Sequence, residues 1–143
     1  MQTINVKLHL SKDFRLVEFT RSSTADRLEI DNTPPQYVID NLVWLCYYIL
    51  QPARTAIKRI IHINSGYRCE KLNKAVGGRP NSLHLQGRAA DIHVKNIEEA
   101  KELAPIFARQ EFCDLVIIEH IADKFWLHVQ MDKIKPRHRI TYA

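Results

Sequence analysis

The sequence NSLHLQGRAAD, residues 81–91, decides the fold and suggests the chemistry. It places a histidine, His84, and a carboxylate, Asp91, on either side of Gly87. Glycine lets the chain turn sharply, and the two alanines before Asp91 suit a strand that packs closely against a neighbouring element. We therefore predict a loop that leads into a strand, with His84 and Asp91 converging on one space.

A second histidine lies near the end of the chain in the sequence FWLHV, residues 125–129. Side chains alternate faces along a strand, so Trp126, His128 and Gln130 would share one face. Two histidines and one carboxylate are an ordinary ligand set for catalytic zinc, which keeps a fourth position for water. Spacing alone does not single out this set. The other histidines that compete for the role are His62, His93, His120 and His138.

Length and composition indicate one globular domain, residues 1–143. A chain of 143 residues can bury a core without disulfides, and its 45% hydrophobic and 26% charged residues are ordinary for such a domain. The three cysteines, Cys46, Cys69 and Cys113, are far apart, which argues against a disulfide framework and against a zinc ribbon. We expect Cys46 and Cys113 to be core residues.

The sequence contains no apolar run of membrane-spanning length, and residues 1–10 lack the apolar block of a signal peptide. The expected location is therefore cytoplasmic as encoded, with no membrane partner. The net charge of +5 would suit an anionic partner. The sequence contains no recognised nucleic-acid-reading element, so we do not expect nucleic acid to be a partner. Much of the positive charge lies in residues 133–139, which we expect to be a solvated, frayed terminus.

Helices are predicted mainly before strands. Ser22 or Ser23 can cap a short helix, and the sequence NTPP at residues 32–35 begins a helix that should run to about Lys58 with a kink or break at Pro52. The next predicted elements are a strand at 60–64, a helix at 68–76, a strand at 89–94 and a helix at 97–109 that is interrupted near Pro105.

Residues 115–119 and 125–131 predict two strands of an antiparallel hairpin, with a turn at 122–124. Helices followed by clustered strands are typical of an α+β fold, with a mainly antiparallel sheet flanked by helices.

The motifs Ser82-x-His84-x-x-Gly87-x-Ala89-x-Asp91 and Trp126-x-His128 resemble the zinc D-Ala-D-Ala carboxypeptidase family of peptidoglycan peptidases. That family shares its fold with the metal-binding domain of hedgehog proteins, so the resemblance implies a hedgehog/DD-peptidase-like fold. The similarity extends over about residues 7–131. It includes Phe14, Glu18-Phe19, Asn32-Thr33-Pro34, Leu50-Gln51-Pro52-x-Arg54, Ile63-x-Ser65-Gly66-Tyr67-Arg68, the segment 72–78 and Ile118-Glu119.

The resemblance implies roles for five residues. His84, Asp91 and His128 would hold Zn²⁺, with water in the fourth position. Arg68 would polarise the scissile carbonyl or hold a substrate carboxylate, which suits a planar and permanently charged guanidinium. Ser82 would bond the substrate or fix the loop, although a plain turn residue is nearly as good an interpretation.

A general base is needed to accept the proton of the attacking water. Many relatives place an acid three positions before the last histidine, where this chain has Phe125. Glu119 is the favoured base, because it resembles an acid that a subgroup of the family carries on the preceding strand. If His120 pairs with Phe125, Glu119 shares a face with His128. Asp123 and His120 rank lower, as a turn residue and as a residue on the opposite face.

The expected function is zinc-dependent hydrolysis of peptide bonds in peptidoglycan stem peptides, by a D-Ala-D-Ala carboxypeptidase or a related endopeptidase. The main alternative is a non-catalytic zinc-binding module of the same fold, which the missing acid at Phe125 supports. We expect a monomer that acts on the cell wall after release or export, as a phage or prophage lysis enzyme would.

Overall fold

A computed structural model describes residues 7–143; residues 1–6, which carry part of the expectation about a signal peptide, lie outside the described residues. The elements in chain order are α1 (Leu16–Thr20), α2 (Ser23–Arg27), α3 (Gln36–Leu45), η1 (Cys46–Leu50), α4 (Gln51–Ile57), β1 (Ile63–Ser65), α5 (Glu70–Ala75), η2 (Leu83–Gln86), β2 (Ala89–His93), α6 (Ile97–Ala108), β3 (Cys113–Ile121), β4 (Lys124–Met131) and β5 (Arg139–Tyr142). No helix within 7–143 is both long and apolar enough to cross a bilayer.

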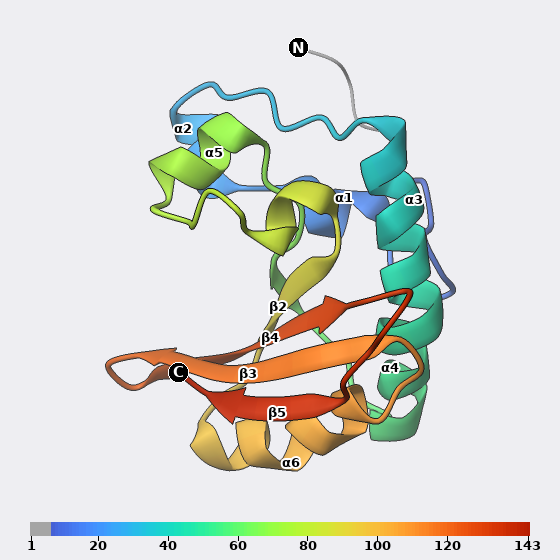
Figure 1. Ribbon diagram of the computed structural model, residues 1–143. Helices are drawn as coiled ribbons and strands as arrows, with labels where there is room; N and C mark the ends of the chain where they lie inside the picture. Colours follow the sequence, from blue (N-terminus) through green and yellow to red (C-terminus); the bar gives the residue numbers. More distant parts are fainter. Residues whose placement is uncertain (1–6) are drawn as a thin grey trace.

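A five-stranded sheet forms the centre of the molecule, in the order β1-β2-β4-β3-β5 (Figure 1). Neighbouring strands run antiparallel except for β3 and β5, which are parallel. Helix α6 lies along the sheet, and the long helix α3–α4 stands beside it (Figure 1). The predicted α+β fold with a mainly antiparallel sheet is confirmed.

The sheet has one apolar face, because side chains alternate along each strand. The apolar face packs against α6 in the core, and burying each large side chain contributes about 1.5–3 kcal/mol. Its fully or almost fully buried residues are Ala90, Ile92, Val116, Ile118, Leu127 and Val129. The opposite face is more polar and carries the candidate site. Cys46 and Cys113 are completely buried, as predicted.

The long helix contains a π-turn where the sequence predicts a break. Pro52 has no N–H to donate to the carbonyl of Tyr48, so the regular ladder cannot continue there. The N–H of Gln51 bonds instead to the carbonyl of Cys46, five residues earlier. Helix α4 then ends at Ile57 and is capped by Lys58, whose φ of 59° is left-handed.

Two local predictions are wrong. Helix α6 is continuous through Pro105, because its buried Ala104 and Phe107 keep the last turn packed against the core. Only one intrahelical donor is lost there, three residues before the helix ends. Strand β1 begins at Ile63 rather than at residue 60, and extends to Ser65.

The C-terminal segment is not frayed. Strand β5 pairs in parallel with β3 and places Ile140 opposite Val116. The N–H of His138 bonds to the carbonyl of Cys113, and its ring donates to the carbonyl of Ala108 at 2.8 Å. The charged side chains of residues 133–139 are exposed to solvent, as predicted, but the prediction of a frayed terminus is wrong. The contacts that order the segment are made with residues far away in sequence, which local charge does not reveal.

Candidate metal centre

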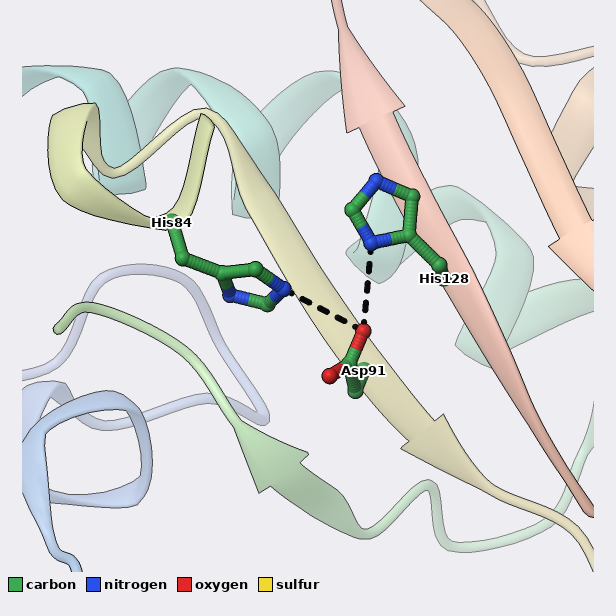
Figure 2. Close-up of side chains that lie close together, drawn as sticks. All are labelled: His84, Asp91 and His128. Carbon is green, nitrogen blue, oxygen red and sulfur yellow. Dashed lines mark hydrogen bonds and ion pairs between the residues drawn. The ribbon is translucent and has the colours of Figure 1, made fainter. Parts of the chain in front are cut away.

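Three side chains from three elements meet on the polar face of the sheet (Figure 2). His84 comes from η2, Asp91 from β2 and His128 from β4. Oδ1 of Asp91 lies 3.3 Å from Nε2 of His84 and 3.2 Å from Nδ1 of His128. One ligand atom from each residue lies within 4.8 Å of the others, so the convergence predicted from residues 81–91 and 125–129 is present.

Strand pairing and a glycine turn produce this arrangement. Asp91 and His128 are direct partners in the β2–β4 ladder. Gly87 ends η2 with a φ of 71°, and a Cβ there would lie 2.7 Å from the carbonyl oxygen of Val38. Only glycine suits both the left-handed backbone and the close approach, which together bring η2 back to the sheet.

His84 is oriented by a backbone carbonyl. Its Nδ1 donates to the carbonyl oxygen of Gly66 at 2.7 Å, which leaves the lone pair of Nε2 facing Asp91. Gly66 itself lies against α1, where a Cβ would come within 2.6 Å of Phe19. This acceptor was not predicted, because a backbone carbonyl has no signature in the sequence.

His128 is oriented by a side chain on its own strand. Its Nε2 lies 2.9 Å from Oε1 of Gln130, so the ring donates there and presents Nδ1 to Asp91. Gln130 was predicted to share a face with His128 but not to contact it. The spacing of two residues along a strand is the signal that pointed to the contact.

The three facing atoms form an electron-rich site that fits a cation. When both rings are neutral, two nitrogen lone pairs point at a carboxylate oxygen, and all three atoms are acceptors. Two imidazoles and one carboxylate are suitable ligands for zinc.

Protons can take the place of a metal at this site. Burial alone would raise the pKa of Asp91, but hydrogen bonds from His128 and His84 hold that pKa well below its usual range. Burial lowers the pKa of His128, yet Asp91 outweighs it, and the pKa of His128 is raised. Metal binding at this site should therefore release protons.

Arg68 and Ser82 lie together beside the three ligands. Nη2 of Arg68 donates to Oγ of Ser82 at 3.4 Å, and the same Oγ accepts the N–H of His84 at 3.2 Å. Nε of Arg68 is buried without a partner among the described residues. Burial lowers the pKa of Arg68, against the effects of Asp91 and Glu119, and an arginine stays charged in such a setting.

Glu119 lies on the same face as His128. In the hairpin His120 pairs with Phe125 and Glu119 pairs with Trp126, which is the register that places Glu119 on the face of His128. Glu119 is half-buried, and its charge acts on both Arg68 and His128. Its carboxylate makes no hydrogen bond or ion pair within residues 7–143, so it is available to a substrate or water.

The remaining candidates lie away from the three ligands. Asp123 is exposed in the turn, and His120 is exposed with its ring against the carbonyl of Ala122. His93 and His62 are exposed and contact one another edge to face. His93 was thus correctly placed on the Asp91 side of its strand, but it is not part of the metal cluster.

Arg68 also lines a cavity of about 230 Å³. Arg21, Asn64 and Ser65 contribute polar groups to its wall. Such a lining suits the amide and carboxylate groups of a peptide better than an apolar ligand.

The chain matches a known protein family. A family model described as Peptidase M15 matches residues 12–130, which is most of the chain. No curated protein matches the chain.

Proposed function

Because the chain belongs to the zinc D-Ala-D-Ala carboxypeptidase (M15) family, we propose that it hydrolyses a peptide bond in the stem peptides of peptidoglycan. Membership in this family supports the assignment of the chain as a zinc-dependent metallopeptidase. One observation carries the proposal: a carboxylate oxygen of Asp91 and one ring nitrogen each of His84 and His128 lie within 4.8 Å of one another. The other ring nitrogen of each histidine donates a hydrogen bond to an oxygen acceptor.

In this proposal Zn²⁺ is held by Nε2 of His84, a carboxylate oxygen of Asp91 and Nδ1 of His128. When bound, zinc supplies Lewis acidity, which lowers the pKa of a water molecule to about 7 and makes it a nucleophile. The chain supplies the other groups that peptide hydrolysis requires.

Glu119 is the proposed general base. Its unpaired, half-buried carboxylate accepts a proton from the attacking water and later donates it to the leaving amine. Arg68, whose side chain is only partly buried, donates from its guanidinium to the substrate, either to the carbonyl oxygen as negative charge develops or to a carboxylate. Ser82 holds the guanidinium in place through Nη2.

The test is digestion of purified peptidoglycan by the zinc-loaded protein, with mass spectrometry of the muropeptides. We expect new peptides that disappear with a chelator and return with added zinc. Loss of a terminal D-Ala identifies a carboxypeptidase, whereas fragments of the stem identify an endopeptidase. Unchanged muropeptides would contradict the proposal and favour a non-catalytic metal-binding module. That alternative is suggested by Phe125, which occupies the position where many relatives have an acid.

Paired variants test the base in the same assay. Glu119→Gln should keep zinc and lose roughly a hundred- to ten-thousand-fold in turnover, the usual contribution of a general base. Asp123→Asn makes the same chemical change in the exposed turn and should leave turnover intact. Normal turnover in Glu119→Gln would show that another group is the base.

A further inference from the structure

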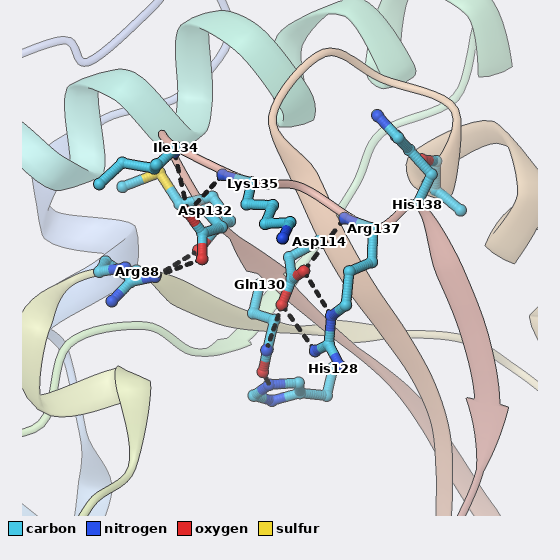
Figure 3. A network of polar contacts seen from close by, with 11 residues as sticks. Arg88, Asp114, His128, Gln130, Asp132, Ile134, Lys135, Arg137 and His138 are labelled. Carbon is cyan, nitrogen blue, oxygen red and sulfur yellow. Dashed lines mark hydrogen bonds and ion pairs between the residues drawn. The ribbon is translucent and has the colours of Figure 1, made fainter.

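A chain of polar contacts links the C-terminal segment to His128 (Figure 3). Arg137 donates from Nε and Nη2 to the two carboxylate oxygens of Asp114, both at 2.8 Å. Nε2 of Gln130 donates to Oδ2 of Asp114 at 3.0 Å. Oε1 of Gln130 then faces Nε2 of His128 at 2.9 Å. Four side chains form this chain of contacts, and the last of them, His128, is a proposed metal ligand.

The chemistry of these groups fixes the direction of every hydrogen bond. An arginine can only donate, so the paired carboxylate of Asp114 is ionised and can only accept. Gln130 must therefore turn its NH₂ group to Asp114 and its oxygen to His128. That oxygen requires a proton on Nε2 of His128, which leaves Nδ1 as the metal-binding nitrogen.

A local irregularity of β3 makes the chain of contacts possible. Cys113 pairs with Met131 and Leu115 pairs with Gln130, so Asp114 is an extra residue on β3. Bulges of this kind redirect a side chain, and here the carboxylate of Asp114 reaches Gln130 on the polar face of the sheet. Asp114 is buried, and the backbone N–H of Arg137 also donates to it at 3.1 Å.

We propose that Gln130, Asp114 and Arg137 are positioning residues that set the affinity of the site for zinc by holding His128 with Nδ1 toward the metal. Arg137 lies beyond residues 12–130, the part of the chain that matches the family model. The C-terminal segment is thereby part of the metal centre. The inference rests on the proposed zinc site, but it does not depend on which bond is cleaved.

Zinc dissociation constants measured by competition with a chromophoric chelator test the proposal. Gln130→Met keeps the shape of the side chain and removes both hydrogen bonds, so affinity should fall about 10- to 100-fold. Arg137→Gln should also lower the affinity for zinc, by about tenfold or less, because Arg137 acts on His128 through two other side chains. Arg139→Gln removes an exposed charge from β5 and serves as the matched control, with unchanged affinity.

A second readout separates orientation from stability. In the zinc-loaded protein, the Nε2 proton of His128 should give a proton resonance that is protected from exchange with water. Gln130→Met should lose that protection while circular dichroism shows an intact fold. Wild-type affinity and protection in Gln130→Met would overturn the proposal, and wild-type affinity in Arg137→Gln would remove the C-terminal segment from it. A wild-type protein that binds zinc but cleaves no peptidoglycan would instead contradict the proposed function alone.

Discussion

At the scale of single residues, the candidate site depends on which nitrogen of each histidine carries the proton. The carbonyl of Gly66 decides this for His84, and Gln130 decides it for His128. The residues of the cluster were predicted, because histidine and aspartate are recognisable by type and the family resemblance singled out these three. The sequence did not predict their hydrogen-bond acceptors, which depend on how separate segments pack.

Gly66→Ala tests the orientation of His84. The new Cβ would meet backbone and Cβ atoms of Phe19 at 2.6–2.7 Å, so β1 and α1 must move apart. We expect a loss of stability of about 1–3 kcal/mol, as for other overpacked sites, together with weaker zinc binding as the carbonyl leaves Nδ1. Urea unfolding and zinc competition measure the two effects.

Gly77→Ala is the control for that variant. Gly77 also sits in a turn, with a φ of 76°, but a Cβ there would have nothing within 4 Å. It should therefore cost about 1–2 kcal/mol from backbone strain alone and leave zinc affinity unchanged. Equal zinc affinity in both variants would show that the Gly66 carbonyl does not control His84.

At the scale of secondary-structure elements, local sequence patterns were sufficient for some elements and not for others. The β3–β4 hairpin was predicted with its register, because apolar residues alternate on either side of a short turn that ends at Lys124. Strand β5 was missed, because its pairing partner β3 is distant in sequence and its flanking charges suggested solvent. An irregularity at Pro52 was predicted as a kink or break, since a missing N–H is a property of the residue itself, and the structure has a π-turn there.

The contact between Arg137, two residues before β5, and Asp114 in the bulge of β3 should make the stability of the protein depend on acid. The hydrogen bond from Arg137 is the main reason that the pKa of Asp114 falls to about 2, although burial opposes it. A lowered pKa stabilises the fold above the unfolded value of about 4, and that contribution is lost as the pH falls through about 2. Asp114→Asn should lack this part of the acid dependence.

Urea unfolding of the zinc-free protein as a function of pH measures the effect. The stability difference between wild type and Asp114→Asn should shrink as the pH falls from about 4 to about 2. Asp123→Asn, in the exposed hairpin turn, should track the wild type throughout. A difference that stays constant with pH would mean that Arg137 does not hold the carboxylate in the ionised form.

At the scale of the whole molecule, the candidate site joins segments that are far apart in the chain. His84 follows the N-terminal helices, whereas Asp91 and His128 belong to the sheet. Sequence spacing suggested that the three could meet, and the family resemblance made the set specific. Their actual convergence depends on the β2–β4 pairing and on the turn at Gly87, which only the folded chain displays.

Zinc should therefore stabilise the folded molecule. A ligand that binds only the native state adds about 2.7 kcal/mol when its free concentration is 100 times the dissociation constant. We expect the melting temperature to rise with added zinc and to fall with a chelator. His84→Ala should abolish the rise, whereas His93→Ala, which changes an exposed histidine outside the cluster, should retain it. A zinc-induced rise in His84→Ala would place the stabilising ion elsewhere.

The two cysteines in the core, Cys46 and Cys113, should react slowly with oxidants and alkylating reagents. Burial raises the pKa of Cys113 to about 12 and raises that of Cys46 well above its usual value. Oxidants and alkylating reagents attack the thiolate, which these two residues hardly form. Cys46 and Cys113 therefore need no reducing surroundings to stay intact, and neither sulfur competes with the histidines for a soft metal such as copper.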